Sequence, residues 1–149
     1  MRQFSEVKEL PYSAAALFEI ISDVDNYAEF LPWCVASRVR ERPDSNTMIA
    51  DLKIGYGGMT ETFASRVTLD RSELTVDTVQ ESGPFRHLES KWHILDRGKN
   101  YSTVNFEIAF EFRSVLLESM MGVVFEAAAH KMIAAFEGRA AALLWSVDA

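Results

Sequence analysis

Between residues 34 and 112 the chain repeatedly alternates apolar with polar residues, a period of two that is typical of β-strands with one buried face. The clearest run contains Val104, Phe106, Ile108, Phe110 and Phe112, each separated from the next by a polar or small residue. Weaker alternation predicts further strands at 4–10, 34–42, 48–54, 62–69, 74–78 and 87–94. Strands in succession, each polar on one face, predict an antiparallel sheet with one face in solvent.

Two parts of the chain have helical periodicity instead. Ser13 is a suitable N-cap for a helix over 14–22, and a second short helix begins at Asp23 and ends before Pro32. From about residue 115 to residue 145, apolar residues recur every three or four positions and predict one long helix. Its expected apolar stripe consists of Leu117, Met121, Val124, Ala128, Met132, Phe136, Ala140 and Leu143. This order of elements predicts an α+β fold in which a curved sheet of about seven strands packs its apolar face on the long helix.

Composition narrows the class of protein. The chain has 149 residues, which predicts a single domain over 1–149. Hydrophobic residues make up 48% of the chain and charged residues 25%, a balance that excludes a disordered protein. With 15 Lys and Arg against 22 Asp and Glu, the net charge is −7, which disfavours nucleic-acid binding by charge alone. We found no uncharged apolar stretch of about 18 residues, no signal peptide and only one cysteine, and we therefore expect a cytoplasmic protein.

Three histidines raise the question of a metal site. His87 and His93 share one face of a predicted strand, but their spacing places them about 20 Å apart. His130 follows Glu126 by one helical turn, which favours an exposed ion pair. No cysteine or carboxylate completes a ligand set at the usual spacing, so we expect no metal site.

Cys34 and the segment GYGG at 55–58 are the other candidates for chemistry. Because no histidine lies near Cys34 in the sequence to act as its base, we expect a buried, structural cysteine. The glycine-rich segment lacks a phosphate-binding pattern and predicts a flexible hairpin turn. Most strand carboxylates fall on the solvent face. We therefore expect no catalytic residue and no cofactor.

The apolar face of the sheet is the most informative feature. Many of the ten Phe, four Tyr and three Trp residues are concentrated where the sheet meets the long helix. Two interpretations remain open at this point. One is a tightly filled core with nothing bound, and the other is a concave apolar pocket whose methionines adapt to a flexible ligand.

Several segments resemble the START-like, helix-grip superfamily, and within it the coenzyme Q-binding protein family, which is related to a bacterial ribosome-association toxin. The matching segments are YAEFLPWC (27–34), SRV (37–39), LKIGY (52–56), ETFASRV (61–67), GPFRHLE (83–89), Trp92, FEIAFEFRS (106–114) and MIAAFEGRAA (132–141). They cover nearly the whole chain in the same order. The resemblance implies a lipid cavity between the curved sheet and the last helix, with ubiquinone as the ligand.

The function implied by this resemblance is non-enzymatic binding and delivery of ubiquinone, in support of respiratory electron transport and ubiquinone biosynthesis. The expected partners are ubiquinone or a similar isoprenoid lipid, a membrane surface contacted transiently at the inner membrane, and proteins of respiration or quinone biosynthesis. Two alternatives stay open: a toxin that binds the large ribosomal subunit and blocks subunit joining, and a START-like cyclase or hydrolase of an aromatic substrate.

Strand parity and the helical stripe together predict the residues that contact the ligand. Each has its side chain on the expected apolar face or belongs to a segment that carries the resemblance. They are Trp33, Ile54, Tyr56, Phe63, Trp92, Phe110, Met121, Val124 and Phe125.

Overall fold

A seven-stranded antiparallel sheet forms the body of the protein and confirms the predicted α+β architecture. The computed structural model describes residues 1–56 and 58–148, without the side chains of residues 56 and 145–148. The strand order is β1-β7-β6-β5-β4-β3-β2, so the first two strands of the chain form the two edges. The strands are β1 (Arg2–Leu10), β2 (Cys34–Asp44), β3 (Thr47–Tyr56), β4 (Met59–Asp70), β5 (Thr75–Ser82), β6 (Phe85–Gly98) and β7 (Tyr101–Phe112).

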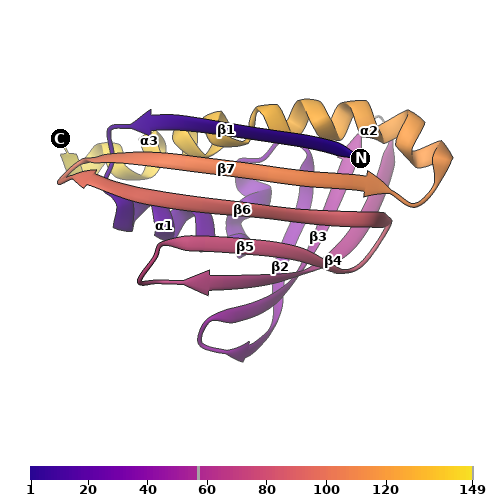
Figure 1. Cartoon of the computed structure of the whole chain (residues 1–149), viewed down its shortest axis with the longest axis horizontal. Helices are drawn as coiled ribbons and strands as arrows, with labels where there is room; N and C mark the ends of the chain where they lie inside the picture. Colours follow the sequence, from indigo (N-terminus) through magenta and orange to yellow (C-terminus); the bar gives the residue numbers. More distant parts are fainter. Residues whose placement is uncertain (57, 149) are drawn as a thin grey trace.

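The sheet curves strongly around the helices. In Figure 1, β5, β6, β7 and β1 run across the view, β2 and β3 stand nearly upright behind them, and β4 bends so that its second part runs beside β5. Register shifts accompany the change of direction, one between Ala64 and Ser65 on β4 and three along β2. Such bulges bend and twist a strand, so they help the sheet to enclose space on its inner face.

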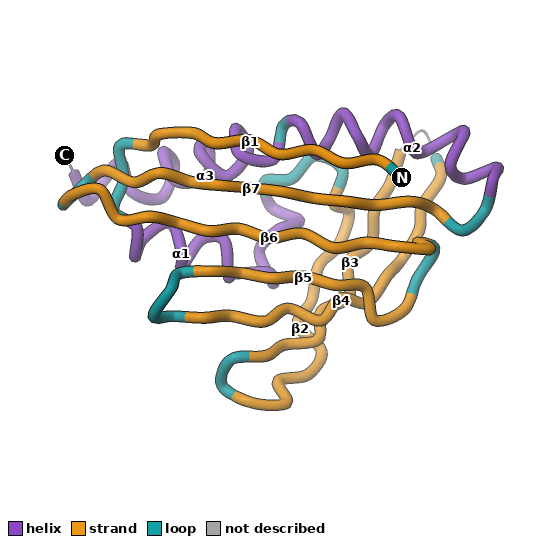
Figure 2. Tube along the Cα trace, viewed as in Figure 1, coloured by secondary structure: helices purple, strands orange, loops and turns teal. Residues whose placement is uncertain are grey.

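Two short helical segments connect β1 to β2, as the sequence predicts. Ser13 is the N-cap of helix α1 (Ala14–Ser22), and its side chain accepts a hydrogen bond from the Ala16 amide. A 3-10 helix, η1 (Val24–Glu29), follows directly. Figure 2 shows these segments and the C-terminal helices on the same side of the sheet.

The predicted long C-terminal helix is wrong in one respect, because the structure divides it into α2 (Val115–His130) and α3 (Met132–Asp148). At Lys131 the backbone amide bonds to the carbonyls of both Ala128 and Ala129, which ends α2. No Pro or Gly stands at this point, and the apolar spacing continues through it. The pattern therefore had no signal for the break.

The helical stripe is also displaced from the prediction. Met121 and Phe136 are buried as expected, but Phe125, Ala129 and Ile133 are buried where Val124, Ala128 and Met132 were expected, and those three are half-buried. Steps of four residues keep one line of side chains in contact with the sheet along α2.

Strand parity is confirmed on β4, β6 and β7, whose predicted inward residues face the core. One predicted strand residue, Leu74, lies instead in the turn before β5 with a φ of 57°. The strand predicted at 34–42 is longer in the structure, where Pro43 and Asp44 form the end of β2. No helix in the described part of the chain is both long and apolar enough to span a bilayer.

Candidate ligand cavity

A cavity of about 70 Å³ lies between the concave face of the sheet and the helices. Its walls come from η1, the loop before β2, five strands and both C-terminal helices. The apolar and aromatic lining residues are Val24, Tyr27, Trp33, Leu52, Phe63, Val67, Leu88, Trp92, Ile108, Phe125, Ala128, Ala129 and Met132. Three hydroxyl side chains, Ser65, Thr78 and Ser90, complete the lining.

The cavity is uncharged. Among the described residues, its lining contains no Asp, Glu, Lys, Arg or His. Tyr27 is the one titratable member, and its hydroxyl already donates a hydrogen bond to the Ile21 carbonyl. Burial raises the pKa of Tyr27 well above its ordinary value, so the phenol stays neutral. An apolar, neutral ligand matches such a lining, because a charged group would lose its hydration without gaining a partner.

Four of the nine predicted contact residues line the cavity: Trp33, Phe63, Trp92 and Phe125. The rings of Trp33 and Phe125 meet edge to face, with centroids 5.8 Å apart, and connect the loop before β2 to α2. Trp33 belongs to the loop before β2 and Phe63 to β4. Trp92 belongs to β6 and Phe125 to α2. The fold thus brings together residues that are distant in the sequence.

Ile54, Phe110 and Met121 are buried in the core but do not line the cavity. Beside Phe110 lies Phe85, a fully buried residue that was not among the predicted contacts. Its ring lies 4.5 Å from that of Phe112 and 6.4 Å from that of Phe110, so phenylalanines fill this end of the sheet.

The other two predicted contacts differ in kind. Val124 is half-buried and lies outside the lining, because α2 turns Phe125 and Ala128 toward the cavity instead. Tyr56 ends β3, but its side chain lies outside the described part of the structure.

The three hydroxyl residues of the lining were not predicted as a site. In the sequence, Ser65, Thr78 and Ser90 each fall on the same strand face as the neighbouring apolar positions. The signal that could have identified them is the coincidence of small hydroxyl residues at inward positions of three successive strands.

Cys34 is buried, as predicted for a structural cysteine, with 4% of its surface exposed. Its thiol lies 3.4 Å from the Ala36 carbonyl, to which it donates a hydrogen bond. Burial raises the pKa of the thiol to about 11, so the reactive thiolate is scarce at neutral pH. A nucleophile would need the opposite shift.

The histidines occupy unrelated surroundings. His87 lies 3.3 Å from Glu89, whereas the ring of His130 packs on Phe4, with centroids 3.9 Å apart. The predicted pair of His130 with Glu126 is wrong, because Glu126 binds Arg2 instead. Within the described residues, no group of three or more His, Cys, Asp or Glu side chains could hold a metal ion.

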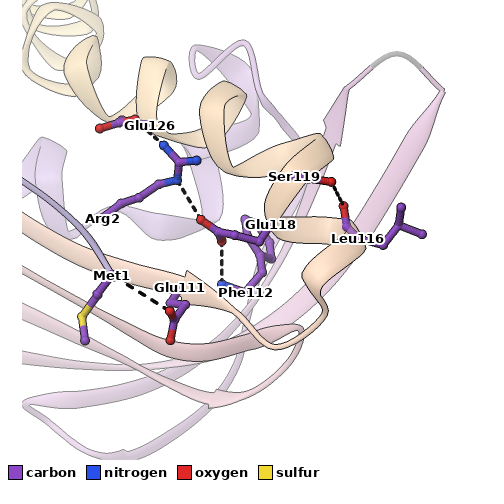
Figure 3. Close-up of polar contacts among 8 residues, drawn as sticks. All are labelled: Met1, Arg2, Glu111, Phe112, Leu116, Glu118, Ser119 and Glu126. Carbon is purple, nitrogen blue, oxygen red and sulfur yellow. Dashed lines mark hydrogen bonds and ion pairs between the residues drawn. The ribbon is translucent and has the colours of Figure 1, made fainter.

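A polar contact holds α2 against the first strand (Figure 3). Arg2 on β1 lies between two carboxylates of α2, 2.8 Å from Glu118 and 2.6 Å from Glu126. Gly122 makes this approach possible, because a Cβ there would lie 2.8 Å from the Arg2 Nε atom. Glu118 also accepts a hydrogen bond from the Phe112 amide at 3.1 Å. We call Arg2, Glu118 and Glu126 the Arg2 clamp.

The electrostatics of the Arg2 clamp favour the ionised pair. Burial alone would raise the pKa of Glu118, but hydrogen bonds from the Phe112 amide and from Arg2 outweigh it and lower that pKa. The hydrogen bond to Glu118 in turn raises the pKa of Arg2. The N-terminal part of α2 is therefore attached through charge as well as through packing.

A larger hollow of about 770 Å³ lies on the other face of the sheet. It is wide open to solvent, and its walls include Asp77, Glu89, Lys91 and Glu107. Its charged walls and open shape do not suit an apolar ligand. The enclosed cavity is the better candidate in spite of its smaller volume.

Comparison with known proteins agrees with this architecture. The family described as polyketide cyclase / dehydrase and lipid transport matches residues 10–137. A ribosome association toxin, RatA, of Rickettsia prowazekii is 37% identical over 143 residues, which cover 94% of this chain and 97% of the toxin. A mitochondrial coenzyme Q-binding protein of Schizosaccharomyces pombe is 36% identical over 131 residues, covering 85% of this chain and 79% of that protein.

Among solved structures, the Zhui aromatase/cyclase of Streptomyces sp. R1128 superposes with a TM-score of 0.81. At 19% sequence identity, and with 93% of each chain covered, this likeness concerns the fold. The chain therefore has the helix-grip fold and belongs to the family of polyketide cyclases, dehydrases and lipid transport proteins.

Proposed function

We propose that this protein binds ubiquinone or a similar isoprenoid lipid in its cavity and delivers it without chemical change. The observation that carries the proposal is the uncharged and mostly apolar lining of the cavity between sheet and helices. Burial of an isoprenoid tail contributes about 25 cal/mol per Å² of apolar surface, so no charged contact is needed for affinity. The relative named as a coenzyme Q-binding protein supports the same ligand class.

Uptake of such a ligand requires movement. Pockets for ligands of this size usually have volumes of about 300–1,000 Å³, whereas the cavity measures about 70 Å³. Both α2 and α3 contribute to its lining, and the helical structure is interrupted between them at Lys131. We infer that the helices move away from the sheet around this break when the ligand binds.

A binding role suits the lining better than catalysis does. General acid–base catalysis needs a titratable group within reach of the substrate. Of the described lining residues, Tyr27 alone is titratable, and its hydroxyl is engaged by the Ile21 carbonyl. The similarity to the Zhui aromatase/cyclase, at 19% identity, concerns the fold alone.

Delivery of an insoluble lipid requires contact with a membrane, and α2 offers a surface for it. Val115, Leu116, Met120 and Val123 are all exposed on this helix. In Figure 3, the Leu116 side chain points away from the body of the protein. Exposed apolar side chains gathered on one helix favour a membrane or protein partner. We propose a cytoplasmic protein that contacts the inner membrane transiently through α2.

The relative named as a ribosome association toxin favours a second candidate function. Arg38, Arg40 and Arg42 are all exposed along the edge strand β2, where they could meet RNA phosphates. Arg38 and Arg40 both approach Asp51, at 3.4 Å and 3.7 Å, which reduces their free positive charge. The net charge of −7 also opposes this role.

One experiment separates the two candidates. Cell extract is fractionated on sucrose gradients at low and at moderate salt, and each fraction is analysed for this protein and for bound lipid. A quinone carrier should stay with quinone at both salt concentrations, since apolar burial is little affected by screening. A ribosome-binding protein should sediment with a subunit and should dissociate steeply with salt, because phosphate contacts release counterions. Salt-sensitive sedimentation without quinone would reject the carrier function.

A further inference from the structure

We propose that Ser65, Thr78 and Ser90 form the site that receives the polar head of the lipid, and that this site selects a neutral head. The inference rests on the proposed function, because it assigns one part of the same cavity to one part of the ligand. We call these three residues the hydroxyl site.

Ser65 supplies the strongest observation. Its side chain is fully buried, lines the cavity, and its Oγ atom has no hydrogen-bond partner among the described residues. Buried hydroxyls in proteins nearly always have a partner, because an unpaired one destabilises the fold. A hydroxyl in this state, directed into an uncharged cavity, is available to a ligand.

The sheet register places the other two hydroxyls beside it. Thr78 on β5 pairs directly with Ser90 on β6 and with Val67 on β4, and Ser65 stands two residues before Val67. Directly opposed side chains have Cβ atoms about 5 Å apart, and diagonal neighbours are about 7–8 Å apart. The three hydroxyls therefore lie in a row across β4, β5 and β6, which spans about 10 Å at the usual strand spacing.

The chemistry of the site defines the head group. A hydroxyl can donate one hydrogen bond and accept others, so the three residues can bind carbonyl, ether or alcohol oxygens. The described lining offers no cation to a carboxylate or phosphate, which would be buried unpaired. A quinone ring or an isoprenoid alcohol fits the hydroxyl site, whereas a fatty acid or a phospholipid does not.

The position of the hydroxyl site gives the ligand a direction. Ser65, Thr78 and Ser90 lie on strands of the sheet, whereas the lining residues Ala128 and Met132 flank the break at Lys131 between the two helices. The head is therefore bound against the sheet, and the tail extends toward the junction of α2 and α3.

The test compares two buried serines that differ in their partners. Ser65 has none in the described structure, whereas Ser102, also fully buried, donates a hydrogen bond to the Tyr12 carbonyl at 2.6 Å and lies outside the cavity lining. Affinity for a short-tailed ubiquinone is measured for wild type, Ser65→Ala and Ser102→Ala by quenching of tryptophan fluorescence. Trp33 and Trp92 line the cavity and serve as reporters. Thermal unfolding of the ligand-free proteins is measured in parallel.

Ser65→Ala should weaken ubiquinone binding roughly tenfold while the Tm of the free protein stays the same or rises. Ser102→Ala should show the reverse, with a lower Tm and unchanged affinity. The wild type should also bind an isoprenoid alcohol at least tenfold more tightly than the carboxylic acid of the same chain length.

Two failures are distinguishable. If the wild type binds ubiquinone and Ser65→Ala binds it equally well, the hydroxyl site is rejected while the carrier function stands. Equal affinity for the alcohol and the acid also rejects the selection of a neutral head. If the wild type binds none of these lipids, the carrier function is rejected, and the hydroxyl site with it.

Discussion

Burial determines what individual side chains of this protein can do. Cys34 is held in its thiol form by an apolar environment, whereas Ser65, also buried, has a hydroxyl without a hydrogen-bond partner among the described residues. The Cys34 thiol is therefore unreactive, whereas the Ser65 hydroxyl is available for binding.

The Cys34 thiol should react slowly with thiol reagents in the native protein. Because its pKa is raised to about 11, the thiolate fraction near neutral pH is far below that of an ordinary cysteine. The rate, measured spectroscopically, should increase steadily as the pH approaches this value. Protein unfolded in urea is the control and should react at the rate of a free thiol. Fast reaction of the folded protein at neutral pH would contradict a structural role.

Phe125→Ala should destabilise the protein by about 3–5 kcal/mol and weaken lipid binding. The reason is that the Phe125 ring fills the space between the cavity and the rings of Phe85, Phe110 and Phe112. Val124→Ala, one position earlier on α2, should cost about 1 kcal/mol or less and leave binding unchanged. Urea unfolding and fluorescence titration measure the two effects, and Phe125→Leu keeps a folded variant available. A larger loss of affinity in Val124→Ala than in Phe125→Leu would show that α2 has another orientation in the complex.

At the scale of elements, the attachment of α2 differs from that of the strands. Strands share ladders of backbone hydrogen bonds, but the N-terminal part of α2 is fixed by side chains, among them the Arg2 clamp. Farther along, Lys8 on β1 binds Glu137 on α3 at 2.7 Å. Charged contacts of this kind are sensitive to pH, which packed apolar surfaces are not.

Acid should loosen α2. The pKa of Glu118 is lowered in the folded protein, so its contribution to stability is complete above the ordinary carboxyl pKa of about 4.3 and is lost as the pH falls through the lower folded value. Glu118→Gln should speed hydrogen exchange of α2 amides at neutral pH and should lose less stability than wild type between neutral pH and about pH 3.

Glu81→Gln is the control for this prediction. It removes a partner of Arg66 on the sheet, 3.0 Å away, without touching any helix. Amide exchange in α2 should be unchanged in this variant. If Glu118→Gln also leaves α2 exchange unchanged, packing alone holds the helix.

The sequence predicted the strands and their inward faces well, because an alternation such as that of 104–112 has one explanation in terms of structure. It did not predict the break at Lys131, since apolar spacing runs through that residue and no helix-breaking residue marks it. It also could not predict that Phe85 fills the space beside Phe110 and Phe112, since that depends on how far the sheet curves. The cavity lining depends on both features, so only part of the site was predictable.

At the largest scale, a single helix, α2, both lines the cavity and exposes apolar side chains to solvent. Phe125 and Ala129 of α2 face the cavity, whereas Leu116, Met120 and Val123 face solvent. A membrane that binds the outer face would therefore act on the inner face as well. Under the proposed function, we therefore expect ligand release and membrane contact to be coupled.

Met120→Glu should reduce ubiquinone transfer between vesicles several-fold without changing the affinity for the lipid, because a carboxylate at the membrane surface opposes contact. Met120 is 46% exposed, and the matched control is Val79→Glu, at a residue 44% exposed on the other face of the sheet. Transfer rates are measured by fluorescence between donor and acceptor vesicles. Equal rates for the two variants would place the membrane contact elsewhere.

The position of β2 at one edge of the sheet has a consequence for solubility under crowded conditions. An edge strand exposes unpaired backbone groups, and these can recruit the same strand of another copy and start aggregation. Here the strand carries Arg38, Arg40 and Arg42, contains Pro43, and is interrupted by three register shifts. Each of these features hinders the continuous pairing that a growing fibre needs. On the membrane surface that we propose as its partner, the protein would reach a high local concentration, and these features would keep it from associating through its own sheet.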